Sequence, residues 1–319
     1  MNASSVIPPR TPEAIQRLMR AAQGEEKADL AVINAQVLNV FTGEIHQNYG
    51  VAVKGEWIVR VSPDVADTIG PETQVIDAAG RTLIPGFIDG HAHMGWIFAP
   101  AAFVPFCITA GVTTVITETL EIYPVAGFEG LLDYLDALQD QPVRFFSTAP
   151  AMVSYSKAAQ GIAPEHLEQL LGREDVLGLG EAYWQAVLQQ PEVYLPAYSQ
   201  THRSQKVIEG HTAGAAEKKL AAYAAAGVTS CHEPINAVQA LSRMRLGIHV
   251  MAREGSIRQD LAEISKINEM GVDLRRLIFA SDGISPQDLV AGKYLNSVVQ
   301  KGIDCGFSPV SAIQAATLN

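Results

Sequence analysis

The chain has 319 residues, of which 48% are hydrophobic and 18% are charged, and its formal net charge is −11. This length and composition are typical of one large or two smaller globular domains with a sizeable core. The acidic balance argues against nucleic acid or an anionic membrane surface as a partner, because both attract clustered Lys and Arg. We therefore expect a small-molecule partner. The sequence also has no apolar run approaching the roughly 18 residues of a membrane span.

The cysteines of the chain point to a reducing compartment. Cys107, Cys231 and Cys305 are widely spaced and odd in number, so they form neither a disulfide framework nor a Cys-x-x-Cys metal site. Residues 1–30 lack the apolar run of a signal peptide. We therefore expect a cytoplasmic protein.

The N-terminal part of the chain changes character at residue 29. Residues 1–28 are a polar lead-in, in which Pro8-Pro9 breaks structure and Thr11-Pro12 predicts the capped start of a helix. Residues 29–82 contain short β-type runs separated by turns, which predict a small antiparallel, sandwich-like β domain. The runs are 29–34, 35–40, 50–54, 57–61 and 74–77.

From residue 83 onward, apolar strand candidates alternate with helical patterns. This alternation predicts an α/β fold, a (β/α)₈ barrel of the TIM type over residues 83–319. The strand candidates are 83–92, 112–118, 143–149, 176–181, 206–210, 228–232, 247–252 and 276–281. The helical patterns are 127–138, 164–171, 213–226, 236–245, 257–270, 286–301 and 308–317.

Six metal-binding side chains fall at the carboxyl ends of these strands, where the catalytic groups of a barrel gather. Two of them, His91 and His93, are two residues apart, so both imidazoles face one side of the first strand. Such a set can hold two divalent ions that share a carboxylate and lower the pKa of water, making hydroxide available near pH 7. The set is His91, His93, Glu181, His211, His232 and Asp282.

The positions of these side chains suggest a role for each. His91 and His93 would hold one ion, and His211 and His232 the other. Glu181 is placed to bridge the two ions. The arrangement suits hydrolytic attack on an sp² carbon that bears nitrogen or oxygen.

Two acids at strand ends are candidates for proton transfer. Asp282 would bind the first ion and also act as general acid/base, passing a proton from water to a leaving amine. Glu233 directly follows His232, and we consider for it either a catalytic role in the barrel mouth or a salt bridge outside the barrel.

Several ordered runs resemble a known family. Residues 85–93, Pro-Gly-Phe-Ile-Asp-Gly-His-Ala-His, resemble the opening metal motif of the amidohydrolase superfamily. Further runs resemble the bacterial adenine deaminase family, in which a glutamate after the fourth strand bridges the metals, and Glu181 matches that glutamate. These runs are 111–115, 176–181, 210–214, 231–233, 253–256 and 315–319.

The resemblance implies both a fold and an activity. The fold would be a (β/α)₈ barrel with a β-sandwich assembled from both chain ends. The activity would be hydrolysis of adenine, or a related aminopurine, to hypoxanthine and ammonia with Mn²⁺ or Fe²⁺, with Zn²⁺ as a third candidate. The family also has a C-terminal domain that this sequence lacks, so we expect a truncated chain, and we expect a homo-oligomer.

Further side chains near the strand ends are candidates for substrate contact. Arg253 and Glu254 are placed to hydrogen-bond a purine edge, with a structural ion pair as the alternative. Glu118 and Glu121 are candidates for substrate or a supplementary metal, with a solvated loop as the alternative. The aromatic candidates for stacking on a planar ring, with lid or core packing as the alternative, are Trp96, Tyr183 and Trp184.

The chain departs from the family pattern at several strand ends. Leu120 stands where the Asp-Pro-His-Glu run of the family has its histidine. Tyr183-Trp184 replaces a smaller pair, and Gly283 follows Asp282 where a second acid is usual. Two other hypotheses therefore stay open. One is hydrolysis of a cyclic amide or another heterocycle, and the other is a non-catalytic family member that binds a ligand.

Overall fold

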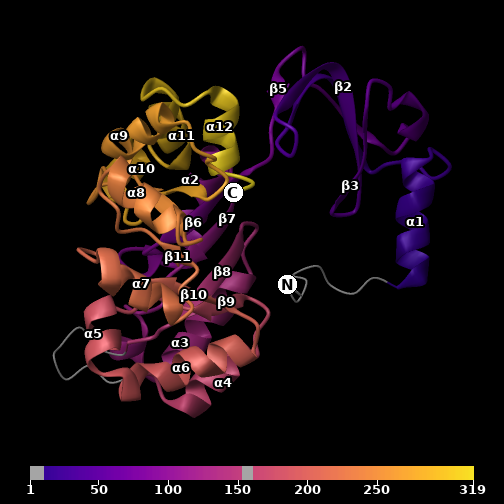
Figure 1. Cartoon of the computed structure of the whole chain (residues 1–319). Coiled ribbons are helices and arrows are strands. Elements are labelled where there is room, and N and C mark those ends of the chain that lie inside the picture. The colour runs from indigo at the N-terminus through magenta and orange to yellow at the C-terminus, as the bar shows by residue number, and fades with distance from the viewer. Residues whose placement is uncertain (1–10, 153–160) are drawn as a thin grey trace. The chain divides into compact units, whose positions relative to one another are not determined.

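The computed structural model describes residues 11–152 and 161–319 (Figure 1). The chain divides into two compact units, one ending at Pro85 and the other running from Gly86 to Asn319. The predicted break at Pro8-Pro9 lies outside the described residues.

The smaller unit is built on one mixed sheet in the order β3-β2-β1-β4, with β5 also paired to β1. The prediction of an antiparallel domain holds for β1, β2 and β3 but is wrong for β4 and β5, which run parallel to β1. The strands are β1 (Leu30–Asn39), β2 (Glu44–Lys54), β3 (Trp57–Ser62), β4 (Gln74–Asp77) and β5 (Thr82–Leu83).

The first strand of this sheet joins two runs that the sequence separates. Residues 29–34 and 35–40 form the single strand β1, whose register with β2 shifts between Val32 and Ala35. Asn34 lies at this irregularity with φ 55°, in the left-handed region that asparagine tolerates better than most residues. A polar residue inside the strand therefore looked like a turn in the sequence.

The helix expected in the lead-in is confirmed as α1 (Pro12–Ala22), which packs on β2 and β3. Thr11 caps it, because its hydroxyl oxygen accepts a hydrogen bond from the backbone N–H of Ala14 at 3.2 Å. Proline occupies the first helical position, where its missing N–H costs nothing.

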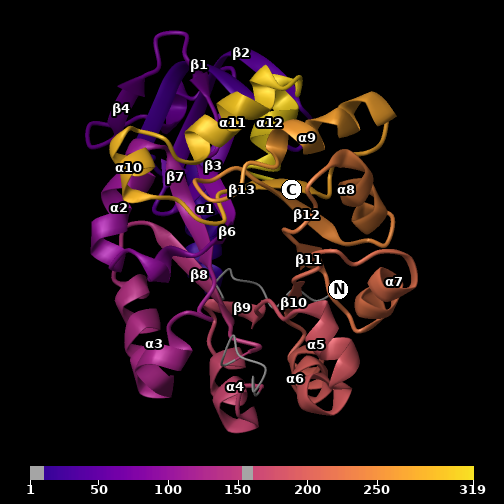
Figure 2. The same cartoon turned by 90° about the vertical axis from the view of Figure 1, so that its left-hand side faces the viewer.

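The larger unit is the predicted barrel, an eight-stranded parallel sheet in the order β13-β12-β11-β10-β9-β8-β7-β6. Figure 2 shows the helices arranged around these strands. The strands are β6 (Phe87–Ala92), β7 (Val112–Thr117), β8 (Arg144–Ala149), β9 (Val176–Leu179), β10 (Val207–Gly210), β11 (Ser230–Cys231), β12 (His249–Arg253) and β13 (Leu277–Ala280). The α/β barrel predicted from the sequence is confirmed.

The helices of this unit match the predicted patterns less closely than the strands do. Within the pattern 257–270 only residues 261–270 are helical, as α9 and a 3₁₀ helix, and the pattern 286–301 divides between α10 and α11. The helices α2, α5 and α6 were not predicted. The helices are α2 (Pro100–Thr109), α3 (Tyr123–Gln139), α4 (Pro164–Leu171), α5 (Trp184–Gln189), α6 (Pro191–Arg203), α7 (Glu217–Ala225), α8 (Ala237–Met244), α9 (Leu261–Ile264), α10 (Pro286–Val290), α11 (Leu295–Asp304) and α12 (Pro309–Ala315).

The barrel closes where β6 meets the end of β13. The backbone N–H of Asp282 donates to His91 O at 3.0 Å, and the N–H of His93 donates to Asp282 O at 2.7 Å. Below this bridge, the buried carboxylate of Asp89 accepts from the N–H of Ser281 at 3.0 Å and from its hydroxyl at 2.6 Å. The closure thus fixes to each other the two strand ends, 91–93 and 281–282, that carry three of the predicted metal ligands.

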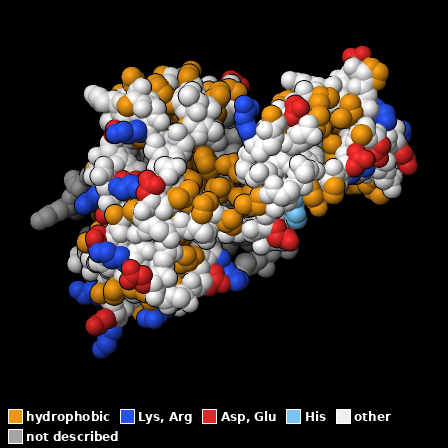
Figure 3. Space-filling view, turned by 90° about the horizontal axis from the view of Figure 1, so that it is seen from above, with side chains coloured by type: hydrophobic (Ala, Val, Ile, Leu, Met, Phe, Trp, Pro, Cys, Tyr) orange, Lys and Arg blue, Asp and Glu red, His pale blue; other side chains and the backbone are white. Residues whose placement is uncertain are grey.

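The described surface carries mixed charges. Basic and acidic side chains are interspersed over the face seen in Figure 3. No helix in the described part of the chain is both long enough and apolar enough to cross a membrane.

Candidate metal centre

Strand ends of the barrel supply every residue of the predicted metal set. His91 lies within β6, and His93 follows it. Glu181 follows β9, His211 follows β10, and His232 follows β11. Asp282, two residues after β13, has φ 61°, a left-handed conformation that aspartate tolerates better than most residues. Its two backbone hydrogen bonds to His91 and His93 hold it there, so its carboxylate turns toward the histidines.

A first triad consists of His91, His93 and Asp282. Asp282 Oδ1 lies 3.3 Å from His91 Nε2 and 3.4 Å from His93 Nε2. The ligand atoms of the three residues all lie within 4.8 Å of one another, and all three side chains are buried. The geometry places both imidazole Nε2 atoms toward one carboxylate oxygen.

A second triad consists of Glu181, His211 and His232. Glu181 Oε2 lies 2.6 Å from His211 Nδ1 and 3.3 Å from His232 Nε2. The other oxygen of Glu181, Oε1, lies 3.7 Å from His93 Nε2 in the first triad. One carboxylate therefore faces both triads, as a bridging ligand must.

The donor set fits a divalent metal site. His91 Nε2 is buried and makes no hydrogen bond within the described part of the chain, although a carboxylate oxygen lies 3.3 Å away. A buried polar atom without a partner is costly, so such an atom aimed at other ligand atoms is typical of a cation site. Imidazole nitrogens and carboxylate oxygens together suit Mn²⁺, Fe²⁺ and Zn²⁺.

The carboxylates of the cluster are held in their ionised forms. Burial acts to raise the pKa of Glu181, but His232 and His211 outweigh it and bring the pKa well below its usual range. At Glu233, burial is likewise outweighed by His232, His211 and Arg253, which hold the pKa at about 2. Anionic ligands are therefore present at neutral pH, as binding of divalent cations requires.

Two further carboxylates lie behind the imidazoles. Glu209 Oε1 lies 2.8 Å from His91 Nδ1 and 3.2 Å from His232 Nδ1. Glu121 Oε2 lies 3.6 Å from His93 Nδ1. Glu209 was not predicted as a site residue, although it lies two residues before His211 at the end of β10, a spacing that places both side chains on one face.

Glu233 and Arg253 join the cluster through an ion pair. Arg253 Nη1 donates to Glu233 Oε1 at 2.7 Å and lies 3.5 Å from Asp282 Oδ2. Glu233 Oε1 also lies 3.2 Å from His232 Nε2. Glu233 thus turns into the barrel mouth, and Arg253 is buried between acids, with Asp260 on its other side.

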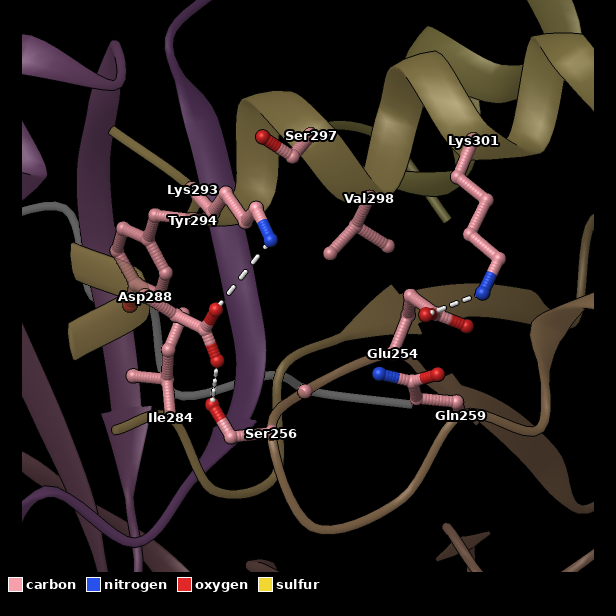
Figure 4. A pocket seen from close by; sticks show the side chains of 11 residues that line it. Glu254, Ser256, Gln259, Ile284, Asp288, Lys293, Tyr294, Ser297, Val298 and Lys301 are labelled. Carbon is pink, nitrogen blue, oxygen red and sulfur yellow. Dashed lines mark hydrogen bonds and ion pairs between the residues drawn. The ribbon is translucent and has the colours of Figure 1, made fainter. Parts of the chain in front are cut away.

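Glu254 points away from the histidines, in contrast to the hypothesis of a purine contact. Its carboxylate pairs with Lys301 of α11 in a separate cavity of about 280 Å³, shown in Figure 4. Asp288, which pairs with Lys293 and Ser256, lines the same cavity. The alternation of side chains along a strand explains the separation, because Arg253 faces into the barrel and its neighbour faces out.

Arg253→Met removes the cation that contacts Asp260 and the two buried acids Glu233 and Asp282, and breaking a buried pair typically costs about 3–5 kcal/mol. We expect a large loss of metal retention and turnover. Glu254→Gln keeps an oxygen for Lys301, so both properties should stay within about twofold of wild type. Metal content and steady-state rates of both variants check this, and equal losses would contradict it.

The three aromatic candidates lie in different surroundings. Trp184 donates its indole N–H to Ala213 O at 2.7 Å and packs against a core cluster, so it does not face the triads. Trp96 instead stacks on His93, with ring centroids 4.6 Å apart and planes 13° apart. Tyr183 meets His211 edge-on at 4.6 Å. Trp96 and Tyr183 thus contact the histidines of different triads.

Glu118 is buried, and the expectation of a solvated loop is wrong for it. Its side chain is 1% exposed. Its carboxylate lies beside Gly180, where an added Cβ would come within 2.4 Å of Oε2, so glycine is required there. Burial, together with the charges of Glu209 and Glu181, raises the pKa of Glu118 well above its usual range. Leu120, at the position of the missing histidine, is also buried.

Sequence relatives cover nearly all of this chain. The adenine deaminase of Cenarchaeum symbiosum is 37% identical over 313 residues, which are 96% of this chain and 51% of that protein. The adenine deaminase of Moorella thermoacetica is 36% identical over 98% of this chain and 54% of its own length. Over nearly its whole length the chain is similar to curated adenine deaminases. It spans about half the length of the curated adenine deaminases it matches. No family model matches it.

Solved structures agree with the fold expected for an adenine deaminase relative. The beta-aspartyl dipeptidase of Fervidobacterium islandicum AW-1 matches with a TM-score of 0.65 at 17% identity, over 90% of this chain and 84% of that one. The N-acetyl-D-glucosamine-6-phosphate deacetylase of Mycobacterium smegmatis matches with a TM-score of 0.63 at 18% identity, over 90% and 87%. At these identities the likeness shows the fold.

Proposed function

We propose that this chain catalyses the hydrolytic deamination of adenine, or of a related aminopurine, to hypoxanthine and ammonia. The observation that carries the proposal is the convergence of two buried triads, joined by Glu181, at one end of the barrel. Relatives named adenine deaminase, 31–37% identical over about 96% of the chain, support this substrate class.

We assign the metal ligands to the two triads. His91, His93 and Asp282 would hold one divalent ion, and His211 and His232 a second, with Glu181 shared between them. When bound, such ions act as Lewis acids and lower the pKa of water, so that a nucleophile forms near neutral pH. We propose Mn²⁺ or Fe²⁺, with Zn²⁺ as a third candidate.

Proton transfer is assigned to two acids. Asp282 has one oxygen toward the histidines and Oδ2 3.5 Å from Arg253, so it is placed to accept a proton from water and deliver it to the leaving amino nitrogen. Glu233, ionised beside His232 and Arg253, is the candidate for a second transfer at a ring nitrogen of the purine.

The substrate side of the site is assigned differently from the expectation based on sequence. Trp96 is 47% exposed and stacks on His93, so its outer face is available for a planar ring. We therefore propose Trp96 and Tyr183 as the flanking aromatic residues, in place of Trp184 and Glu254.

Ammonia release tests the proposal directly. Purified protein loaded with Mn²⁺ or Fe²⁺ should release ammonia from adenine and convert it to hypoxanthine, measured by a coupled assay and by chromatography. A panel of other aminopurines and cyclic amides is run beside it. Turnover of a cyclic amide without turnover of any aminopurine would replace this proposal with the alternative hydrolase. Metal binding without turnover of any member would favour a ligand-binding role.

The remaining expectations concern surroundings and assembly. We propose a small-molecule heterocycle as the partner, because the net charge of −11 argues against nucleic acid and anionic membrane surfaces. Three unpaired cysteines support a reducing compartment, the cytoplasm. The homo-oligomer stays a prediction, which light scattering in solution checks.

A further inference from the structure

Glu209 occupies the space between the two triads on the side away from their shared carboxylate. It lies on β10 and is 3% exposed. Its Oε1 is within hydrogen-bond distance of His91 Nδ1, at 2.8 Å, and of His232 Nδ1, at 3.2 Å. The two imidazole rings stack on each other with centroids 4.0 Å apart and planes 18° apart. One carboxylate oxygen therefore faces one histidine from each triad.

These contacts decide which nitrogen of each ring is free. An imidazole that donates its Nδ1–H to a carboxylate has its lone pair on Nε2. His91 Nε2 faces Asp282, and His232 Nε2 faces Glu181. Glu209 thus selects, in both rings at once, the tautomer whose free nitrogen points toward the other ligands of its triad.

We propose that Glu209 is a positioning residue shared by both metal sites, so that the affinities of the two sites depend on one carboxylate. This proposal rests on the proposed metal centre and goes beyond it, because none of the assigned ligands links the Nδ1 atoms of the two triads. Carboxylates behind ligating histidines typically change metal affinity by about 10- to 100-fold. Here the effect should appear at two sites.

Glu121 offers a matched comparison within the same chain. Its carboxylate lies behind His93 only, with Oε2 at 3.6 Å from Nδ1. Removing it should weaken the site of His91, His93 and Asp282 and leave the other site close to wild type. A residue that merely supports the fold would not separate the two sites in this way.

Titration of metal-free protein with Mn²⁺, by calorimetry and by competition with a chelator, measures each site. We expect two equivalents in the wild type, and about 10- to 100-fold weaker binding of both in Glu209→Leu. Glu209→Gln keeps an acceptor oxygen without the charge, so its loss should be intermediate. Glu121→Gln should weaken one equivalent only. Circular dichroism of each variant checks that the barrel is folded.

Several results would overturn the proposal. In the described residues Glu209, His91 and His232 also form a group close enough to hold an ion themselves. Three equivalents in the wild type, with one lost in Glu209→Gln, would make Glu209 a ligand instead. Weaker Mn²⁺ binding at only one site in Glu209→Leu would show that Glu209 is not shared by the two sites. Wild-type Mn²⁺ affinity at both sites in Glu209→Leu would show that Glu209 positions neither. Wild-type protein that binds no Mn²⁺ would refute both this proposal and the metal centre, whereas two tight equivalents without deamination would refute only the proposed activity.

Discussion

The variant Asp282→Asn is expected to lose deamination of adenine by about 10³-fold or more in kcat. General acid–base catalysis typically contributes about 10²- to 10⁴-fold, and this carboxylate is also assigned to the first metal. Asparagine keeps an oxygen at the position of Oδ1, but its amide accepts no proton at neutral pH. The kcat measured by ammonia release at saturating adenine, with metal content measured in parallel, checks the expectation.

Asparagine is the appropriate replacement because of the backbone at this position. Asp282 has φ 61°, and asparagine tolerates the left-handed region as aspartate does, whereas alanine would be strained. The hydrogen bonds between 282 and β6 use backbone atoms and should persist. The matched control is Asp304→Asn at the exposed end of α11, which should keep wild-type kcat. A kcat for Asp282→Asn within tenfold of wild type would contradict the assignment.

The fold of the barrel follows from the sequence because its strands are short apolar runs at regular intervals. Val112–Thr117 and Leu277–Ala280 are strands buried in a parallel sheet, which local composition indicates well. Parallel pairing of β4 and β5 with β1 was not predictable in this way. The direction of a strand in a sheet depends on pairing between residues far apart in the sequence, so a local residue pattern does not predict it.

The clustering of the six candidate ligands was predictable from the sequence because each lies at the end of an apolar strand or within two residues after it. Where a side chain turns after a strand end was less predictable. Arg253 and Glu254 looked equivalent in sequence, yet one lies among the acids of the cluster and the other pairs with Lys301. Trp184 begins α5, a helix that the sequence analysis missed, and its indole is held by Ala213 O.

Glu209 shows what sequence reasoning omits when it looks only for ligands. Side chains alternate along a strand, so Glu209 and His211, which are two residues apart, lie on one face. A search for residues that hydrogen-bond the candidate ligands would therefore have found Glu209. Its pKa is a consequence of that position. Burial acts to raise the pKa, but His91 and His232 outweigh burial and hold the pKa at about 2. The charge that orients the imidazoles is therefore maintained at neutral pH.

The variant Asp89→Ala is expected to destabilise the barrel by about 2–4 kcal/mol, the largest stability effect that we predict. Asp89 is fully buried, and its two oxygens accept from the N–H and the hydroxyl of Ser281. Alanine leaves both donors buried without a partner, and each such loss typically costs about 1–3 kcal/mol. Burial raises the pKa of Asp89, with the hydrogen bonds from Ser281 opposing that rise. Removing the carboxyl group therefore also removes the cost of burying it. The expected loss of stability is for this reason smaller than the sum of the penalties for the two unpaired donors.

The same contact joins stability to function, because Ser281 precedes Asp282. Losing the link between β6 and β13 should therefore weaken Mn²⁺ binding by the His91, His93 and Asp282 triad as well as the fold. Asp89→Asn is the matched control, since one amide oxygen can still accept from the Ser281 N–H while the hydroxyl of Ser281 rotates to accept from the amide. It should lose less than half as much stability as Asp89→Ala. Urea unfolding followed by circular dichroism measures both variants, and equal midpoints for Asp89→Ala and wild type would show that barrel closure does not depend on this carboxylate.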